Sequence, residues 1–339
     1  MSDPLKKIRF VCPFHSIGDS LIVGNYHFSP HIPLDEADAL LCDWAPSPEL
    51  LSFSRPKAWY CCEPLTRYPG YRQQNWQAVL QRLPPSCAFN HLQPSPACRV
   101  PHFTHWLKKL PMWNNPDRLP RAVAVISNPG FERVFRSADT RLRLAFATHR
   151  SVDLFGNRER WSHFRRIPLL TRHGPPANFR GEVEGAWGQQ PKIRLLSSYR
   201  VCVCLENTCE PFYFTEKFVD AAQAGCIPIY HAHPTVKRGV LKSARWVDPE
   251  SFGFSSDRTL AFALNADPRD YQEANAAWLA SEAFQATRKD RVYTAIADRL
   301  FQSPSAPPLP PVETEFAGVM RKAFSRLRLG ALLPAEARI

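Results

Sequence analysis

The chain has 339 residues, of which 44% are hydrophobic and 12% aromatic, and its 43 Lys and Arg against 31 Asp and Glu give a net charge of +12. This length exceeds one ordinary core and predicts two domains, while the apolar content excludes a wholly disordered chain. The positive charge favours a polyanionic partner, namely nucleic acid, acidic lipid or a phosphorylated small molecule, without distinguishing among them.

The N-terminal residues and the cysteines bear on the cell compartment. The opening, MSDPLKKIRFVCPF, lacks the apolar stretch of a signal peptide, and no later segment approaches the roughly 20 apolar residues of a membrane span. None of the ten cysteines forms a C-x-x-C pair, which favours reduced, strand-buried thiols over a zinc site. We therefore expect a soluble, cytoplasmic protein.

Short apolar runs separated by helix-length segments recur in the first third of the chain. Such runs are typical of buried parallel strands. A charged, proline-broken stretch at 107–122 interrupts the pattern, so we place the end of an N-terminal α/β domain, 1–118, within it. The strands expected in this domain are 8–12, 39–44, 58–62 and 87–92.

The same alternation resumes after the boundary and predicts a second α/β domain at 119–302. A helix is expected at 131–150. Two such blocks imply two facing, doubly wound Rossmann-like domains, whose ligands bind beyond the carboxyl ends of the strands. The strands expected in the second domain are 122–127, 152–156, 200–206, 226–230 and 244–248.

Residues 303–339 form a tail of different composition. The segment 303–315 is a proline-rich linker, and within 316–333 apolar residues recur at helical spacing opposite basic ones. This basic amphipathic helix predicts either peripheral contact with an anionic membrane, on its inner face, or a helix that packs back on the body. The sequence favours neither reading.

The stretch CLENTCEPFYFTEKFVDAAQAGCIPIY, residues 204–230, joins two expected strands through a loop and a helix. Thr215 suits the N-cap of that helix, and Gly225 suits the left-handed C′ position at its end. Glu216 and Lys217 then lie on the first turn. The stretch has no glycine-rich loop, which excludes a P-loop and a dinucleotide fingerprint.

A helix N-terminus attracts phosphate, and the residue types around this one extend that preference. Lys217 would neutralise a diphosphate, and Asn207, at the carboxyl end of the preceding strand, would donate an amide hydrogen bond to it. Glu216 would instead accept hydrogen bonds from sugar hydroxyls. Together they predict a nucleotide-sugar site, although Glu216 and Lys217 taken alone also fit an ordinary, solvated helix start.

The run at 199–230 resembles the signature of the α-1,3/α-1,4-fucosyltransferases, glycosyltransferase family 10, whose core reads roughly F-E-N-[ST]…Y-x-T-E-K…[VI]-P-[IV]. Weaker likeness in AWYCCEP, VISNPGFERVF and VDLFGN extends the resemblance from about residue 57 to about residue 250. It implies a GT-B architecture. It also implies a GDP-fucose donor held mainly by the C-terminal domain and an acceptor glycan held mainly by the N-terminal one.

The resemblance further implies roles for individual residues. Glu63, after the expected strand at 58–62, falls on the family's catalytic carboxylate, and inverting transfer needs such a base. No D-x-D occurs near the helix start, so no cofactor is required, with stimulation by Mg²⁺ or Mn²⁺ left open. The donor-binding positions are Arg133, Asn207, Tyr213, Glu216 and Lys217, and the less direct candidates are Asn128, Arg136 as the alternative register for Arg133, Glu206 and Thr215.

The chain also departs from the family pattern. Ala232 stands where the family usually has glycine, and His231 and His233 beside it fit turn positions better than pocket positions. These departures leave the acceptor and the donor sugar open. The hypotheses are an inverting fucosyltransferase acting on an N-acetylglucosamine-containing glycan, a GT-B transferase with another nucleotide sugar, and a basic nucleic-acid-binding protein. The scattered basic residues and the lack of a nucleic-acid motif argue against the last.

Overall fold

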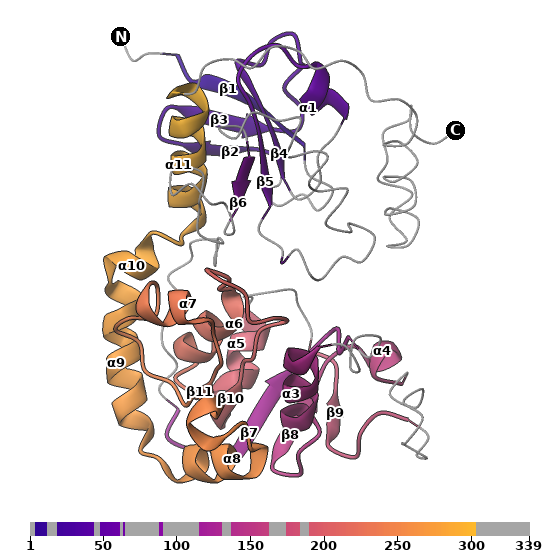
Figure 1. Cartoon of the computed structure of the whole chain (residues 1–339), viewed down its shortest axis with the longest axis vertical. Helices are drawn as coiled ribbons and strands as arrows, with labels where there is room; N and C mark the ends of the chain where they lie inside the picture. Colours follow the sequence, from indigo (N-terminus) through magenta and orange to yellow (C-terminus); the bar gives the residue numbers. More distant parts are fainter. Residues whose placement is uncertain are drawn as a thin grey trace. The chain divides into compact units, whose positions relative to one another are not determined.

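The computed structural model describes residues 4–11, 19–43, 48–61, 64, 88–90, 115–130, 137–162, 174–183 and 190–302. The chain divides into two compact units, each built on a mainly parallel sheet (Figure 1). The first comprises Met1–His102 with Asp290–Ile339, and the second Phe103–Lys289. The two Rossmann-like α/β units expected for a GT-B chain are therefore confirmed, whereas the predicted tail at 303–339 lies outside the described residues.

The sheet of the first unit has the strand order β2-β3-β1-β4-β5-β6. All neighbouring strands pair in parallel except β2, which runs antiparallel to β3. A short helix, α1 (Pro48–Ser52), precedes β5. The strands are β1 (Lys6–Val11), β2 (Leu21–Val23), β3 (Tyr26–Ser29), β4 (Ala39–Asp43), β5 (Lys57–Cys61) and β6 (Ala88–Asn90).

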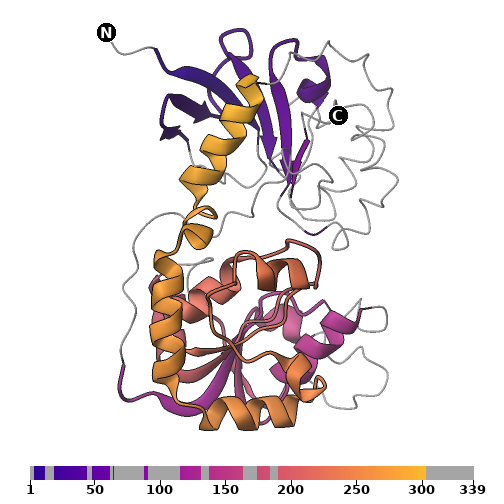
Figure 2. The same ribbon diagram turned by 60° about the vertical axis from the view of Figure 1, so that its left-hand side comes forward.

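Helix α11 (Lys289–Gln302) packs on this first sheet, although the sequence placed residues up to 302 in the second domain. Figures 1 and 2 both show it alongside β1 and β3. Its fully buried Tyr293 donates a hydrogen bond to Asp43 Oδ2 at 3.0 Å. An apolar helix face does not reveal which sheet it covers, so only the folded contacts assign it. The Tyr293 ring lies 5.4 to 6.2 Å from the ring centroids of Phe28, Phe10 and Tyr60.

The sheet of the second unit is parallel throughout, with the order β11-β10-β7-β8-β9. The chain starts in the middle of this sheet with β7, builds outward to β9, and then crosses to the other side of β7 for β10 and β11. The strand order therefore reverses between β7 and β10, which is where ligands bind in sheets of this kind. The strands are β7 (Leu119–Val125), β8 (Val152–Phe155), β9 (Phe179–Gly181), β10 (Tyr199–Val203) and β11 (Ile227–Ile229).

Both faces of the second sheet are covered by helices (Figure 2). On β7, Val123 joins the apolar cluster with α5, α6 and α9, whereas Ala122 and Ala124 join the cluster with α3 and α8. Strands buried on both faces lose the polar alternation, which explains why they read as continuous apolar runs. The helices are α3 (Ala138–Ala147), α4 (Arg158–Ser162), α5 (Gln190–Ser197), α6 (Glu216–Gln223), α7 (Pro234–Arg238), the 3₁₀ helix η6 (Pro249–Phe252), α8 (Ser256–Asn265), α9 (Pro268–Ala280) and α10 (Glu282–Gln285).

Several predicted elements differ from the structure. The strand expected at 244–248 is wrong, since only Val247 forms an isolated bridge to Ile229. The helix expected at 131–150 begins at Ala138 within the described residues, because Ser137 caps it. Strands β2, β3 and β9 were missed, although the Gly24–Asn25 pair between β2 and β3 is a hairpin signal. No helix in the described part of the chain is long and apolar enough to cross a membrane.

Replacing Tyr293 tests the attachment of α11. Tyr293→Ala should lower the free energy of unfolding of the first unit by about 3–5 kcal/mol, because it empties a fully buried aromatic site. Tyr293→Phe keeps the ring and should cost only about 1–3 kcal/mol, for the hydrogen bond to Asp43. Denaturant unfolding checks both values. Equally small effects of the two substitutions would show that the Tyr293 ring is not packed in the core of the first unit.

Candidate functional site

The loop and helix that follow β10 fold as their residue types predict. Thr215 is the N-cap of α6, with extended backbone angles (φ −128°, ψ −175°), and its side chain accepts a hydrogen bond from the Lys217 backbone N–H at 3.4 Å. Gly225 follows the helix with φ +69°, a conformation that favours glycine. The predicted cap, helix and exit are therefore confirmed, and Glu216 and Lys217 lie on the first turn.

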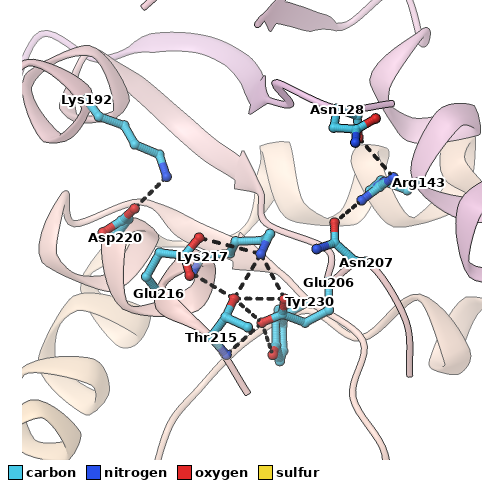
Figure 3. Close-up of polar contacts among 10 residues, drawn as sticks. All are labelled: Asn128, Arg143, Lys192, Glu206, Asn207, Thr215, Glu216, Lys217, Asp220 and Tyr230. Carbon is cyan, nitrogen blue, oxygen red and sulfur yellow. Dashed lines mark hydrogen bonds and ion pairs between the residues drawn. The ribbon is translucent and has the colours of Figure 1, made fainter. Parts of the chain in front are cut away.

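A buried carboxylate, that of Glu206, holds this helix start in place (Figure 3). Its Oε1 accepts hydrogen bonds from the Thr215 backbone N–H at 2.9 Å and from the Tyr230 hydroxyl at 2.9 Å. The Thr215 hydroxyl lies 2.7 and 2.8 Å from its two oxygens, and Lys217 Nζ donates to Oε2 at 3.1 Å. Burial raises the pKa of the Tyr230 hydroxyl well above its usual value, with the Glu206 charge adding to the effect, so this group stays a donor.

The Lys217 ammonium lies at the helix start between three oxygen atoms. Besides Glu206 Oε2, it reaches Thr215 Oγ1 at 2.9 Å and Glu216 Oε1 at 3.5 Å. The Lys217 side chain is 23% exposed and that of Glu216 15% exposed, whereas that of Glu206 is 3% exposed. The ammonium therefore joins a buried acid on one side to a more accessible acid on the other.

A second group of contacts lies on the loop after β7. Arg143, a buried residue of α3, donates to Asn207 Oδ1, to Pro129 O at 3.0 Å and to Asn128 O at 3.3 Å. Because a guanidinium only donates, the Asn207 amide must face it with oxygen and turn its N–H groups the other way. The Asn128 side chain accepts from the Gly130 backbone N–H at 3.2 Å, which shapes the same loop.

These two groups meet at the switch point between β7 and β10. Asn128 follows β7, and Glu206 and Asn207 follow β10, so strand ends on both sides of the reversal contribute. Glu206 and Asn207 are consecutive, and Figure 3 shows one directed to the start of α6 and the other to Arg143. The structure therefore brings Asn128, Glu206, Asn207, Glu216 and Lys217 to the carboxyl ends of β7 and β10 and the start of α6, whereas their role in binding a ligand stays a prediction.

The remaining predicted site residues fall into two sets. Tyr213 is buried in the loop before α6, where its backbone N–H donates to Glu210 O at 3.2 Å, and its role in donor binding stays a prediction. Glu63, Arg133 and Arg136 lie outside the described residues, and their proposed roles stay predictions.

Sequence reasoning missed Arg143 and underestimated Glu206. A signal for Arg143 exists, since this cation shares a helix face with the buried Thr140, Leu144 and Ala147. A charged residue on an apolar face needs a buried partner and is a candidate for a structural or functional role. The dominant role of Glu206 has no local signal, because its partners lie 9 to 24 residues away.

A histidine–carboxylate group follows β11. His231 Nδ1 lies 2.9 Å from Asp248 Oδ1, and Asp248 and Glu250 accept from Lys237 Nζ at 2.6 and 2.5 Å. The possible metal-ligand atoms of His231, Asp248 and Glu250 lie within 4.8 Å of one another. Both carboxylates, however, form ion pairs with the Lys237 ammonium. His233 caps α7. Both turn histidines therefore have structural partners, as ordinary turn positions would.

The comparisons with known proteins concern the fold. No family model matches the chain, and no curated protein matches its sequence. Among solved structures, it is similar to an α1,3-fucosyltransferase, with 16% identity, a TM-score of 0.47 and coverage of 89% of this chain and 92% of that chain. The chain is also similar to an α1,3-fucosyltransferase with GDP, with 16% identity, a TM-score of 0.47 and coverage of 91% of this chain and 95% of that chain. For an α1,3-fucosyltransferase with GDP-fucose, the identity is 15%, the TM-score is 0.40, and the coverage is 91% of this chain and 94% of that chain. A likeness at this level does not reveal what this chain binds.

Thr215→Val tests the helix cap and its link to Glu206. The substitution keeps the shape and removes the hydroxyl, so it should cost about 1 kcal/mol for the cap and about 1–3 kcal/mol for the lost donor to a buried carboxylate. Thr215→Ser retains the hydroxyl and should recover most of that stability. Chemical denaturation provides the measurement. A valine variant as stable as the serine variant would show that the hydroxyl contributes nothing.

His231 should make stability depend on pH. Its hydrogen bond to Asp248, with a further one to Cys209, raises the pKa of His231 from 6.5 to about 9. Because the folded-state value exceeds the unfolded one, the stabilisation is complete below pH 6.5 and is lost as the pH rises through about 9. The free energy of unfolding should therefore fall between these pH values in the parent protein and less steeply in His231→Gln. If the free energy of unfolding fell equally steeply with pH in the parent and in His231→Gln, the charged His231–Asp248 pair would not be the cause.

Proposed function

We propose that the protein is an inverting glycosyltransferase that transfers fucose from GDP-fucose to a hydroxyl group of an acceptor glycan. The observation that carries the proposal is the Lys217 ammonium, which two buried neighbours hold at the N-terminus of α6, beside a topological switch point. The resemblance of 199–230 to the family 10 signature supports the choice of donor, and the family expectation for the product is an α-1,3 or α-1,4 linkage to N-acetylglucosamine.

The start of α6 would hold the diphosphate of the donor. Negative charge grows on this leaving group as the bond to the sugar breaks, and a fixed ammonium together with the helix dipole stabilises that charge. Of the three side chains that contact the Lys217 ammonium, Glu216 lies at the longest distance, 3.5 Å. It is also more accessible than the buried Glu206 and Thr215. The diphosphate would replace this contact and leave the Glu216 carboxylate to accept hydrogen bonds from the sugar.

Asn207 would act beside Lys217. Arg143 orients its amide so that the N–H groups face away from the guanidinium, ready to donate to a phosphate oxygen. Arg143 itself is a positively charged neighbour of the same loop, supported by α3. Arg143 is therefore an alternative to Arg133 and Arg136 for electrostatic support of the diphosphate.

The remaining chemistry needs a base to take the proton of the acceptor hydroxyl during in-line attack. The resemblance places Glu63, two residues after the end of β5 in the sequence, in this role. Support for Glu63 comes from the sequence alone.

Calorimetric titration with GDP tests the donor site. Lys217→Met should weaken GDP binding about tenfold to a hundredfold, because a hydrogen bond to a charged group is worth about 1.5–3 kcal/mol and a factor of ten corresponds to about 1.4 kcal/mol. The parent protein should bind GDP more tightly than UDP. If the folded parent protein binds neither nucleotide, the proposal is wrong; tighter binding of UDP would point to a transferase with another donor.

Two further variants serve as controls for this titration. Lys237→Met makes the same chemical change at a lysine of matched exposure, 22% against 23%, that also contacts two carboxylates, and it should leave GDP binding within about twofold. Glu63→Gln should keep GDP binding and abolish most turnover of GDP-fucose. Loss of GDP binding in both Lys217→Met and Lys237→Met would indicate an effect of net charge alone.

A further inference from the structure

An ammonium group has three protons, and three oxygen atoms of neighbouring side chains lie within 3.5 Å of the Lys217 nitrogen. Two fixed acceptors, Glu206 Oε2 at 3.1 Å and Thr215 Oγ1 at 2.9 Å, take the first two. The tetrahedral geometry of the nitrogen then determines where the third points. Glu216 Oε1 forms an ion pair with the ammonium at 3.5 Å, and its side chain is the more accessible of the two carboxylates, 15% exposed against 3% for Glu206.

Glu206 is well suited to act as the fixed acceptor. Its side chain is 3% exposed, and apart from Lys217 it is held by the Thr215 backbone N–H, the Thr215 hydroxyl and the Tyr230 hydroxyl. These donors come from the start of α6 and the residue after β11, so the carboxylate cannot turn without breaking contacts to two elements. A carboxylate restrained in this way transmits its orientation to the ammonium.

We propose that Glu206 is a positioning residue, which never contacts the substrate and acts only through Lys217 by directing its third N–H at the leaving diphosphate. This inference rests on the proposed function and deepens it, because it separates the direct ligand of the diphosphate from the group that aims it. It also changes the role expected for Glu206 from the sequence, which was that of a less certain donor-binding residue.

The charge of Glu206 has two opposing effects on the reaction. It weakens the attraction of Lys217 for a bound anion, but it fixes the direction of the hydrogen bond as charge develops in the transition state. Glu206→Gln keeps the shape and removes the charge. GDP binding should therefore stay within about threefold or become tighter, whereas kcat should fall about 100-fold, the size of loss that follows a misplacement of about 1 Å.

A double-mutant cycle tests whether Glu206 acts through Lys217. Turnover of GDP-fucose is measured for the parent, Glu206→Gln, Lys217→Met and the double variant. The double variant should be no slower than Lys217→Met, because removing the aiming group has no effect once the ammonium is gone. Additive losses would overturn the proposal, since Glu206 would then contribute by a route independent of Lys217.

Asp220→Asn is the matched control for loss of a buried charge. Asp220 lies on the same helix, is fully buried, and accepts from Lys192 Nζ at 2.6 Å, a contact that makes no use of Lys217. Both variants should lower the unfolding temperature, but only Glu206→Gln should lower kcat by more than about threefold at a temperature where both are folded. Equal losses of kcat would overturn the proposal and leave Glu206 a structural acid.

The parent protein separates this inference from the proposed function. If the parent binds GDP and turns over GDP-fucose but the cycle is additive, only the positioning role fails. If the folded parent shows neither property, the proposed function fails and the inference falls with it. If Glu206→Gln binds GDP-fucose more weakly than the parent but binds GDP equally well, Glu206 contacts the sugar directly, and this result would also overturn the inference.

Discussion

The buried carboxylate of Glu206 is the constraint on which the rest of the site depends. A carboxylate removed from water is stable only when donors surround it, and here a backbone N–H, two hydroxyl groups and an ammonium do so. Removing any of these partners leaves part of the charge unsatisfied. The end of β10, the start of α6 and the end of β11 are consequently tied to one another by a single side chain, and the position of Lys217 follows from that arrangement.

The topology explains why these groups gather at this edge of the sheet. In a parallel sheet all carboxyl ends lie on one side, and the strand order reverses between β7 and β10, the place where ligands bind in sheets of this kind. Arg143 links the loop after β7 to the loop after β10 through Asn207, and Glu206 links the latter to α6. Two consecutive residues, Glu206 and Asn207, thus contact the elements on both sides of the reversal.

Among the described residues that contact one another at this site, the charges balance, whereas the whole chain has a net charge of +12. Arg143 and Lys217 supply two positive charges, and Glu206 and Glu216 supply two negative ones. A polyanion that is bound by net charge alone would find little attraction here. A small ligand with phosphate at one end and hydroxyl groups at the other suits the arrangement better, because both signs of charge can then be used. This local balance favours the nucleotide-sugar proposal over nucleic-acid binding.

A comparison of Lys217 with Lys237 shows how the place of a residue in the fold matters. Both ammonium groups are partly exposed and contact two carboxylates, yet only Lys217 lies on the first turn of a helix of the switch region. The second group, with His231, Asp248 and Glu250, holds the turn after β11 to the segment before η6. The two clusters are chemically similar, and only their places in the fold distinguish them: the proposed donor site includes the one at the start of α6.

The sequence by itself determined the two α/β units, most of the buried strands, and the local geometry around Thr215 and Gly225, because strand hydrophobicity and helix capping are short-range properties. It also placed Asn207 at the end of the preceding strand and Glu216 and Lys217 on the first turn of the helix, as the structure confirms. Only the tertiary structure assigned α11 to the first unit, revealed Arg143 as the partner of Asn207, and made Glu206 the central acceptor. Those contacts join residues 11 to 250 positions apart, and no local pattern records which distant donor meets a given carboxylate.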